Sequence, residues 1–393
     1  MECVNVSKLV GKSEKGTTMK IVHVITGLGV GGAELMLKRL VIHSIQKQQF
    51  EHIVISLTDL GVIGPELQNE GIKVYSLGMK NALSTPIILI RLRKLLKVIK
   101  PNIVQTWMYH ADFIGGIVAK SIGIRKIIWG IRTTDVSQAK SNITVYLSKI
   151  CAKLSYTIPD YIICAANVSR DYHVNLGYNR SKMIVIPNGF ELDKLLISEA
   201  YNLEIRNEID LSIDDITIGS IGRFNLDKNQ RLFIVTASIL IKKFPKLKFL
   251  IVGKDNTKDN VELMSWINEY GLSDSFRLLG LRDDVTKCLN AIDIFCLHSK
   301  TEGFPNVLGE AMAIGLPCVS TDVGDAAYIM GDLGKLVPTN NADELAKAIE
   351  NIIHTTLRDI ETLDKLKLES RQRIQENFSM EKVYREYVNT WCR

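Results

Sequence analysis

The sequence predicts an α/β protein made of two doubly wound, Rossmann-like domains. Short apolar segments of strand length alternate with segments of helix length through almost the whole chain, which is typical of parallel sheets covered by helices on both faces. The alternation occurs once in each half, and 393 residues are too many for one ordinary core. Ligands of such sheets bind beyond the carboxyl ends of the strands, so we expect the two domains to face a central cleft that holds the site.

Each element is expected where an apolar run of the right length is bounded by turn residues. The expected strands cover residues 20–26, 52–57, 72–77, 102–106, 126–131, 160–165 and 183–187 in the first half, and 216–222, 247–252, 276–279, 292–297 and 317–321 in the second. Expected helices include 33–48, 86–100, 111–121, 141–157, 229–243, 261–270 and 305–314.

The domain boundary is expected near the Pro-Asn-Gly turn at 187–189, directly after a buried strand. We therefore predict a first domain over 19–187 and a second over 188–375. The tail from about 340 onward is helical in pattern. Apolar residues recur at helical spacing in its last turns and need a surface to cover, so about 376–393 should cross back to the first domain. Residues 1–18 are polar and lack periodicity; we expect a leader that is disordered or not native, with Met19 as the natural start.

Composition favours a cytoplasmic protein. The chain is 46% hydrophobic and 23% charged, as in globular domains, and it has neither a signal peptide core nor an apolar run of the ~20 residues that span a bilayer. Seven cysteines are scattered without a Cys-x-x-Cys pair, which indicates a reducing compartment. The formal charge of +6 comes without an aromatic-interleaved basic patch, so no nucleic acid is expected as a partner.

No metal or other cofactor is expected. The histidines show no His-x-x-x-His spacing, and the chain contains no Asp-x-Asp sequence, whereas enzymes that hold a divalent metal under a diphosphate need acidic ligands of that kind. A metal-free site must neutralise its phosphates with arginine, lysine and backbone amides.

The segment 301–317 reads Thr-Glu-Gly-Phe-Pro-Asn-Val-Leu-Gly-Glu-Ala-Met-Ala-Ile-Gly-Leu-Pro. Pro305 suits the first helical position, and the amides that follow it, from Asn306 to Leu308, would attract an anion. Glu302 in the loop and Glu310 on the helix could accept hydrogen bonds from sugar hydroxyls. The set suits a phosphorylated sugar. The alternative is an ordinary amphipathic helix with solvated glutamates.

Two cations of the second half form a candidate diphosphate clamp. Arg223 ends an expected strand, and Lys228 follows five positions later, just before a helix. Both should therefore lie at the carboxyl edge of the sheet, where a guanidinium and an ammonium can hold a diphosphate. Two solvated surface cations are the alternative.

The first half offers a glycine-rich loop at 27–34, with Gly31 and Gly32 before a helix, which lets the backbone approach a ligand closely. A dinucleotide fingerprint would need an acidic residue ~20 positions on, at the end of the second strand. Asp59 lies too far on, so NAD is disfavoured, while a purely structural turn stays open.

Three polar residues of the first half follow expected strands. His110 and Asp112 come after strand 102–106, and Arg132 follows strand 126–131. Each should point toward the cleft, where a histidine can share a proton. A structural histidine is the alternative.

The expected helices 86–100 and 141–157 are basic and amphipathic. Such helices can lie on an anionic membrane surface, so the protein could be peripheral on the inner face of the membrane. The alternative is a covering helix with a solvated basic face.

Together these motifs resemble glycosyltransferase family 4, whose members are retaining enzymes of GT-B fold. The resemblance runs from Met19 to the C-terminus. It is carried by Gly-Gly-Ala-Glu at 31–34, Ile-Pro-Asn-Gly at 186–189, Gly-Arg-Phe at 222–224 with Lys-Asn at 228–229, and Glu-Gly-Phe-Pro-Asn-Val-Leu-Gly-Glu at 302–310. The last, with two glutamates eight positions apart, is the most specific.

The resemblance implies roles for these residues. Arg223 and Lys228 would grip the donor diphosphate, and Glu302 would contact the donor sugar near the reacting carbon. Glu310 would bind the ribose. The remaining donor-binding residues would be Gly31 and Gly32, facing the phosphates and the acceptor, and the 304–308 segment: Phe304, Pro305, Asn306, Val307 and Leu308. Many members carry a histidine where this chain has Arg132, so His110, Asp112 and Arg132 are expected to face the sugar or the acceptor.

The leading hypothesis is a metal-independent retaining transferase that moves a sugar from a nucleotide-sugar, with UDP favoured, to a hydroxyl of a glycan or lipid-linked acceptor. Surface polysaccharide such as lipopolysaccharide or capsule would be the product. The first domain would bind the acceptor and the second the nucleotide-sugar. Two alternatives are kept: a sugar-nucleotide epimerase of similar build, which would need no acceptor, and a non-catalytic nucleotide-sugar-binding protein.

Overall fold

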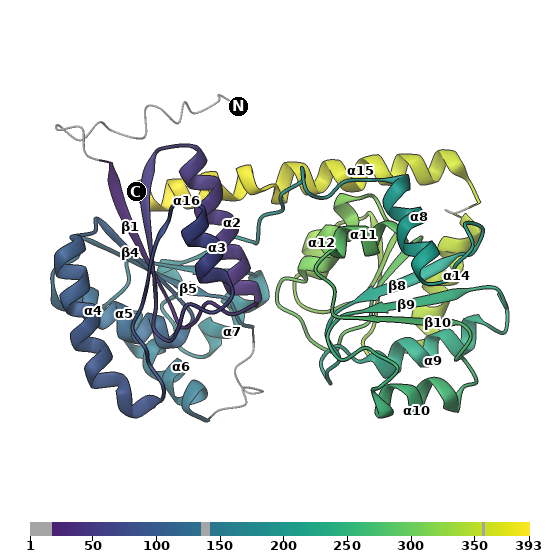
Figure 1. Cartoon of the computed structure of the whole chain (residues 1–393), viewed down its shortest axis with the longest axis horizontal. Coiled ribbons are helices and arrows are strands. Elements are labelled where there is room, and N and C mark those ends of the chain that lie inside the picture. Colours follow the sequence, from purple (N-terminus) through teal and green to yellow (C-terminus); the bar gives the residue numbers. More distant parts are fainter. Residues whose placement is uncertain (1–17, 135–141, 356–357) are drawn as a thin grey trace. The chain divides into compact units, whose positions relative to one another are not determined.

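A computed structural model describes residues 18–134, 142–355 and 358–393. The chain divides into two compact units: the described residues of the first are 18–134, 142–189 and 380–393, and those of the second are 190–355 and 358–379 (Figure 1). The leader expected at 1–18 falls, except for its last residue, outside the described part.

The N-terminal unit contains a parallel sheet of seven strands in the order β3-β2-β1-β4-β5-β6-β7. Its strands are β1 (Met19–Ile25), β2 (Phe50–Ser56), β3 (Lys73–Ser76), β4 (Ile103–Trp107), β5 (Lys126–Ile131), β6 (Tyr161–Cys164) and β7 (Met183–Val185). The order reverses at β1, as in a doubly wound sheet. All seven expected strands of this half are present, with ends shifted by up to two residues.

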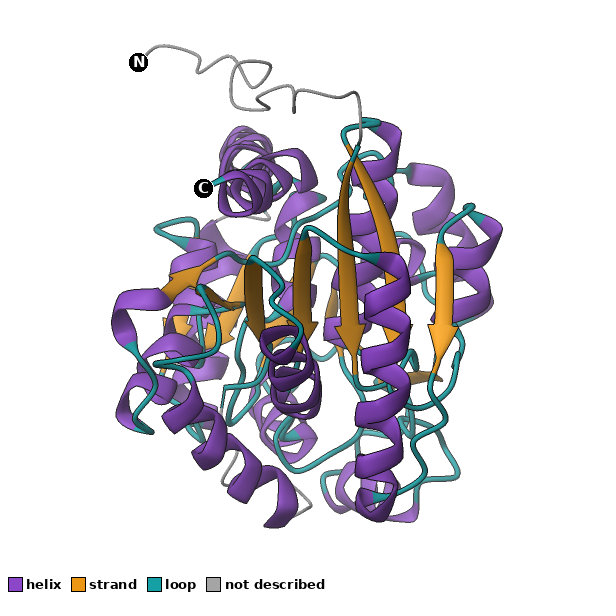
Figure 2. Cartoon of the chain, turned by 90° about the vertical axis from the view of Figure 1, so that its left-hand side faces the viewer, coloured by secondary structure: helices purple, strands orange, loops and turns teal. Residues whose placement is uncertain are grey.

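Helices cover both faces of this sheet (Figure 2). The helices are α2 (Gly32–Gln46), α3 (Ile63–Asn69), α4 (Thr85–Ile99), α5 (Tyr109–Ser121), α6 (Asn142–Leu154) and α7 (Asn167–Asn175). One apolar core joins the sheet to α4, α5 and α6, and another joins its opposite face to α2, α3 and the C-terminal helix α16 (Met380–Cys392). The strands are nearly continuous hydrophobic runs because both faces are covered.

The C-terminal unit repeats the plan with six parallel strands in the order β10-β9-β8-β11-β12-β13. They are β8 (Thr217–Ile221), β9 (Lys248–Val252), β10 (Phe276–Gly280), β11 (Ile294–Leu297), β12 (Cys318–Thr321) and β13 (Gly334–Val337). The sequence did not predict β13, a four-residue edge strand with only one buried residue, because so short and exposed a segment lacks a strand signal.

The helices of this unit are α8 (Glu199–Glu208), α9 (Gln230–Leu240), α10 (Val261–Glu269), α11 (Val285–Asn290), α12 (Asn306–Ala313), α13 (Ala326–Met330), α14 (Ala342–Thr355) and α15 (Ile360–Phe378). Helices α9, α10 and α14 share one core with the sheet.

The end of the chain returns to the N-terminal unit, as the sequence predicted. The helical tail is interrupted at Ser379, so that α15 belongs to the C-terminal unit and α16 to the N-terminal unit. Tyr387, Val388 and Trp391 of α16 are buried in the core beside α2. The outgoing connection runs beside the returning one, since the amide of Phe190 donates to the carbonyl of Phe378 (2.9 Å). The units divide at Gly189 and Met380, within about four residues of the bounds inferred from the sequence.

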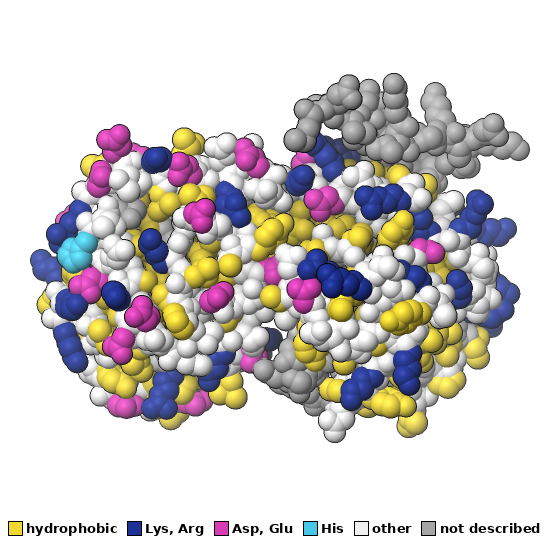
Figure 3. Space-filling view, turned by 180° about the vertical axis from the view of Figure 1, so that it is seen from behind, with side chains coloured by type: hydrophobic (Ala, Val, Ile, Leu, Met, Phe, Trp, Pro, Cys, Tyr) yellow, Lys and Arg dark blue, Asp and Glu magenta, His cyan; other side chains and the backbone are white. Residues whose placement is uncertain are grey.

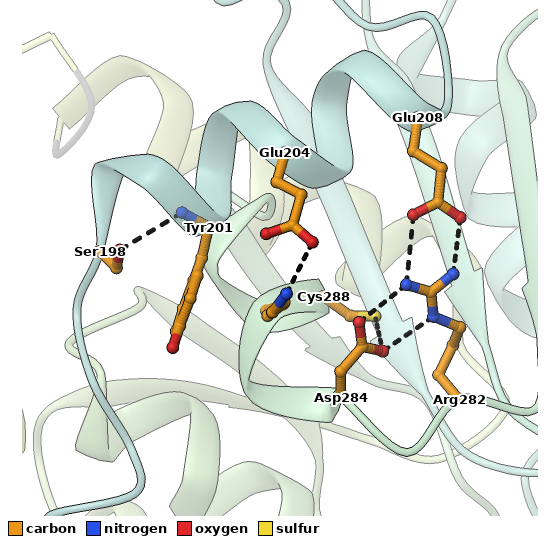
Figure 4. A network of polar contacts seen from close by, with 8 residues as sticks. Ser198, Tyr201, Glu204, Glu208, Arg282, Asp284 and Cys288 are labelled. Carbon is orange, nitrogen blue, oxygen red and sulfur yellow. Dashed lines mark hydrogen bonds and ion pairs between the residues drawn. The ribbon is translucent and has the colours of Figure 1, made fainter.

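A charged cluster joins α8 to α11 in the C-terminal unit (Figure 4). The guanidinium of Arg282 is shared between the carboxylates of Glu208 (2.6 and 3.2 Å) and Asp284 (2.8 and 2.8 Å). Lys287 adds an ion pair to Glu204 at 2.6 Å. The cluster fixes α8, the first helix after the domain connection, to the strand β10–helix α11 junction.

Among the described residues, no helix has the length and hydrophobicity needed to cross a membrane.

Candidate functional site

The carboxyl edge of the C-terminal sheet positions the two candidate cations. After β8 the chain stays beside the end of β9: the amide of Gly222 donates to Val252 and that of Phe224 to Lys254 (both 2.8 Å). Gly253 permits this approach, since it has φ +137° and a Cβ there would lie 2.3 Å from the carbonyl oxygen of Gly222. Arg223 is therefore held at the sheet edge with an exposed side chain.

Lys228 reaches back toward this edge from the turn before α9. Its methylene groups lie beside Gly222, 3.4 Å from where a Cβ would stand. Its ammonium is 2.5 Å from Oε1 of Glu302, and the two side chains are 24% and 12% exposed. The hydroxyl of Ser299 donates to the same carboxylate oxygen (2.7 Å). The structure thus brings together the lysine and the first glutamate that the sequence singled out, 74 positions apart.

His298 contacts the backbone of Lys228. Its Nδ1 lies 2.6 Å from the carbonyl oxygen of Lys228, and its ring stacks on Phe233 with centroids 4.9 Å apart. Burial lowers the pKa of His298 to about 4, so the ring is neutral and Nδ1–H is the donor. The histidine fixes the backbone of Lys228 and carries no charge into the site.

The loop that carries Glu302 is fixed by a second glycine contact. Gly324 has φ +56°, and a Cβ there would lie 2.4 Å from the carbonyl oxygen of Gly303, so only glycine allows the loop after β12 to lie against it. The amide of Asp325 donates to that oxygen (2.8 Å).

The prediction that Pro305 is the first helical residue is wrong. It is the N-cap of α12 with φ −72° and ψ 90°, and Asn306 is the first helical residue. A proline has no amide hydrogen, so Pro305 cannot donate to a phosphate. Its carbonyl instead accepts from the amide of Leu308 at 3.1 Å.

Side chains of the 304–308 segment divide between core and surface. Phe304 packs on Phe190 and Phe378 with centroids 6.1 and 5.7 Å apart, and Leu308 is fully buried. These two can meet a ligand only through their backbones. Asn306 and Val307 are half-buried, as is Glu310.

In the N-terminal unit the glycine-rich loop ends at α2, whose N-cap is Gly31. A Cβ on Gly31 would lie 2.5 Å from Oε2 of Glu34. The Glu34 carboxyl therefore folds back over the start of its own helix, and burial raises its pKa. Gly32 is exposed. The anion-attracting end of α2 thus already holds a carboxyl group of this chain.

The prediction that Asp112 faces a sugar is wrong. Asp112 is fully buried, with Oδ1 2.5 Å from the hydroxyl of Thr106 and 3.4 Å from the amide of Gly130. Burial raises the pKa of Asp112 to about 8. Because α5 begins at Tyr109, two residues earlier than its polar pattern indicated, Asp112 turns inward onto the sheet.

Arg132 has contacts that the sequence did not predict. Its guanidinium donates to Oδ1 of Asn188 (2.8 Å) and to the hydroxyl of Tyr387 (3.4 Å), and it lies 5.1 Å from the ring centroid of Trp107. It therefore joins the end of β5 to the domain connection and to α16. This corrects the expectation of a sugar-facing side chain.

His110 is half-buried on the first turn of α5, and burial lowers its pKa. It stays a candidate. Asp135, which follows the same strand as Arg132, lies outside the described residues.

Sequence reasoning missed a buried network beside His110. The hydroxyl of Tyr109 lies 2.8 Å from Oγ1 of Thr133 and 2.6 Å from Nε2 of His173, and Nδ1 of His173 lies 2.6 Å from the carbonyl oxygen of Ser169. A carbonyl only accepts, so Nδ1 carries the proton and Nε2 accepts from Tyr109. The network fixes the loop after β5 against α5 and α7. Only the spacing of polar residues after strands could have indicated it.

Two family models match the chain. One, described as Glycosyltransferase Family 4, matches residues 30–194, and one described as Glycosyl transferases group 1 matches residues 215–355. Together they span both units. The chain belongs to glycosyltransferase family 4.

Two relatives of this chain are named for transfer to sugars linked to diphosphoundecaprenol. An Escherichia coli UDP-Gal:α-D-GlcNAc-diphosphoundecaprenol α-1,3-galactosyltransferase is 27% identical over 67% of this chain and 69% of its own. A Campylobacter jejuni N,N'-diacetylbacillosaminyl-diphospho-undecaprenol α-1,3-N-acetylgalactosaminyltransferase is 26% identical over 73% and 78%. An uncharacterized glycosyltransferase of Methanocaldococcus jannaschii is 29% identical, and the match spans 65% of each chain.

Solved structures show the same GT-B fold. Anabaena Alr3699/HepE in complex with UDP has a TM-score of 0.82 at 20% identity, covering 95% of this chain and 99% of that one. Sucrose-phosphate synthase of Thermosynechococcus elongatus has a TM-score of 0.74 at 17% identity, covering 95% and 98%. The predicted family and fold are thereby confirmed.

Proposed function

We propose that this family 4 member is a retaining glycosyltransferase that moves a sugar from a UDP-sugar to a hydroxyl of a lipid-linked glycan acceptor. The observation that carries the proposal is the pair of Lys228 and Glu302 with Ser299 at the carboxyl edge of the C-terminal sheet. These two side chains lie in contact at the ligand-binding edge of a doubly wound sheet. When a donor binds, the lysine can pair with a phosphate and the glutamate can accept a hydrogen bond from a sugar hydroxyl.

The transfer breaks the bond between the anomeric carbon of the sugar and the diphosphate oxygen, and the electron pair leaves with the diphosphate. The acceptor hydroxyl attacks on the same face, and its proton passes to the departing diphosphate. Lys228 and Arg223 would stabilise the negative charge that develops on the leaving group. Such preorganised electrostatic stabilisation is commonly the largest catalytic contribution, and the chemistry proposed needs no metal.

The donor and the acceptor are inferred from the relatives. HepE structures contain UDP or UDP-glucose, and two relatives transfer sugars to diphosphoundecaprenol-linked acceptors. We propose that the C-terminal unit binds the donor, with Glu310 on the ribose and the 304–308 backbone beside the phosphates. The N-terminal unit would bind the acceptor, with His110 facing it, in polysaccharide synthesis at the inner face of the cell membrane.

The assignment is tested by replacing Lys228 or Glu302 with alanine. Each variant should lose at least about a hundredfold in kcat, the effect typical of removing one group that stabilises developing charge. The readout is the release of UDP from UDP-sugars in the presence of a lipid-linked acceptor, with donor binding measured in parallel by thermal shift against UDP-, GDP- and ADP-sugars.

A matched control breaks a comparable ion pair elsewhere in the same unit. Lys243 contacts Glu350 at 2.8 Å on the surface, so Lys243→Ala should leave activity unchanged. Full activity of both Lys228→Ala and Glu302→Ala would refute the assignment. Conversion of the donor without an acceptor would indicate an epimerase, and donor binding without any turnover would indicate a binding protein.

A further inference from the structure

The layer formed by α4, α5 and α6 on one face of the N-terminal sheet carries an unusual concentration of positive charge. Residues 80–159, which contain these helices, hold thirteen lysines and arginines against two aspartates and no glutamate. Their formal charge is +11, whereas the whole chain carries +6, so all other residues together carry −5. One of the two aspartates, Asp112, is fully buried. On α4, α5 and α6 themselves the cations are Arg91, Arg93, Lys94, Lys97, Lys120, Lys149 and Lys153, and the acid is the buried Asp112.

The outer face of α4 is also apolar, which an ordinary covering helix would avoid. Ile88, Leu92 and Leu96 point into the core. On the opposite side, Ile87 is 50% exposed, Ile90 55% and Val98 80%. Leu83, in the turn before the helix, is 90% exposed. Lys94 and Lys97 lie between these aliphatic residues at helical spacing.

Helix α6 repeats this pattern. Ile143 and Tyr146 are 56% and 68% exposed, and Tyr156, just after the helix, is 58% exposed. Lys149 and Lys153 are exposed as well. The spacing of these residues by three or four places them on one side of the helix. Both helices pack against α5, so their outer faces belong to the same layer.

The cations of this layer are not used to hold the fold together through ion pairs. Over residues 18–134, 142–355 and 358–393, no lysine or arginine of α4 or α6 forms one. Arg91 and Arg93 donate instead to neutral oxygens of Leu77 (2.7 Å) and Ser121 (3.3 Å). Seen from behind, hydrophobic and basic side chains lie next to one another at the lower right of Figure 3, the part of the N-terminal unit that carries α4 and α6 in Figure 1.

We infer that the outer face of α4 and α6 docks on an anionic phospholipid bilayer. Aliphatic and tyrosine side chains would enter the interface between head groups and acyl chains, while the lysines beside them would stay at the level of the lipid phosphates. A nucleic acid or an acidic polymer would satisfy the charge, but it would leave the exposed isoleucines, valine and leucine without a partner. The inference rests on the proposed function in one point: a lipid-linked acceptor would lie in the same membrane on which the protein docks.

Sedimentation of the full-length protein with vesicles tests the inference. Vesicles of phosphatidylglycerol and phosphatidylcholine should bind the protein, pure phosphatidylcholine should not, and binding should weaken as salt rises. Lys94→Glu with Lys97→Glu should lower the partition coefficient by at least about tenfold, since each basic residue near an anionic surface contributes about 1 kcal/mol. Ile87→Ser with Ile90→Ser should also lower it by at least about tenfold, since about 0.8 kcal/mol is lost for each methylene no longer buried and about 1.4 kcal/mol corresponds to a factor of ten.

A matched charge change identifies the surface. Lys242 and Lys246 are exposed lysines of the C-terminal unit, and reversing both to glutamate should leave vesicle binding within about twofold of the wild type, because they lie outside the proposed surface. Equal loss in this control would overturn the inference. The inference would also be overturned if the protein bound a soluble polyanion such as heparin as strongly as it binds vesicles, and if the isoleucine substitutions did not change that binding.

Donor binding separates this inference from the proposed function. All three double variants should show the wild-type thermal shift with UDP-sugar, since none alters the C-terminal site. A protein that binds vesicles through α4 but fails to bind or turn over any nucleotide-sugar would leave the membrane surface standing and refute the transferase.

Discussion

At the scale of single residues, Asp112 is the clearest case of a polar side chain whose environment sets its chemistry. Its carboxyl lies inside the N-terminal core beside Thr106 and Gly130, and Oδ2 is a buried oxygen without a hydrogen-bond partner among the described residues. A carboxylate would be costly there. With its pKa raised to about 8 by burial, Asp112 is protonated at neutral pH and acts as a neutral hydrogen-bonding group.

This predicts a pH-dependent gain in stability for Asp112→Asn. The unfolded aspartate ionises near its usual value of 3.8, whereas the folded one holds its proton to about pH 8. In the wild type, the free energy of unfolding contributed by this group therefore falls as pH rises through that range, by at most about 1.4 kcal/mol per pH unit. Asparagine does not ionise, so the variant does not lose this stability. The free energy of unfolding of the variant minus that of the wild type should therefore increase from pH 5 to pH 8 in urea titrations followed by tryptophan fluorescence.

The fluorescence is made specific to the N-terminal unit by Trp266→Phe, because the other three tryptophans, at 107, 129 and 391, belong to that unit. A difference between Asp112→Asn and wild type that is constant with pH would contradict the protonated state of Asp112.

At the scale of elements, the cluster of Arg282, Glu208 and Asp284 shows how a helix after a domain connection is fixed. The planar guanidinium makes two-pronged contacts with both carboxylates (Figure 4). An ammonium group cannot reproduce that geometry. The hydrogen bonds that Arg282 donates to both carboxylates raise its pKa above its ordinary value, so the guanidinium stays charged.

We expect Arg282→Lys to destabilise the C-terminal unit by about 1 kcal/mol, at the upper end for partly exposed ion pairs because a network is lost. Differential scanning calorimetry should show the lower melting temperature, and the loss should shrink in high salt. Arg358→Lys is the control, since Arg358 is exposed in the same unit and should tolerate the change. An unaltered melting temperature for Arg282→Lys would mean that the cluster does not stabilise α8.

At the scale of the whole molecule, a buried hydrogen-bond chain connects the first strand to the last helix. Trp107 Nε1, which can only donate, lies 3.3 Å from Nδ1 of His23. Nε2 of His23 then donates to Nδ1 of His52 (2.9 Å), and Nε2 of His52 to Ser44 (2.7 Å). The hydroxyl of Ser44 donates in turn to that of Tyr384 on α16 (3.4 Å). Each histidine has one donating and one accepting nitrogen, so both must be neutral.

Acid should therefore destabilise the N-terminal unit selectively. Burial lowers the pKa of His52 to about 3 and that of His23 well below 6.5. Below about pH 6.5 the histidines of the unfolded chain are protonated, whereas those of the folded chain stay neutral. The free energy of unfolding therefore decreases as pH falls from 6.5 toward 3, by at most about 1.4 kcal/mol per pH unit for each histidine. Urea unfolding of Trp266→Phe with Asp112→Asn between pH 7.5 and pH 5 measures the slope without the opposing contribution of Asp112. Buried His173, whose pKa is lowered to about 4, adds to the slope in the same direction.

The control is the exposed His354 of the C-terminal unit, whose replacement by glutamine should leave the slope unchanged. In the variant that also carries Asp112→Asn, a free energy of unfolding that is flat from pH 7.5 to pH 5 would show that the buried histidines accept protons in the folded state.

The two parallel sheets, the crossing of the last helix and the pairing of Lys228 with Glu302 could all be expected from the sequence. Apolar runs of strand length and turn residues are local signals, and the carboxyl edge of a parallel sheet is a consequence of topology. Residues that follow the ends of β8 and β11, such as Lys228 and Glu302, must therefore come near one another whatever their separation along the chain.

Only the tertiary structure decided which polar side chains face inward. Asp112 and Arg132 follow strands just as Arg223 does, yet Asp112 is buried and Arg132 holds the domain connection and Tyr387 of α16, because the exact start of α5 and the position of α16 set their directions. The order of polar and apolar residues determined the fold and the chemistry available at each sheet edge. The orientation of each side chain depended on packing between segments up to hundreds of residues apart. The local pattern of polar and apolar residues does not determine that packing.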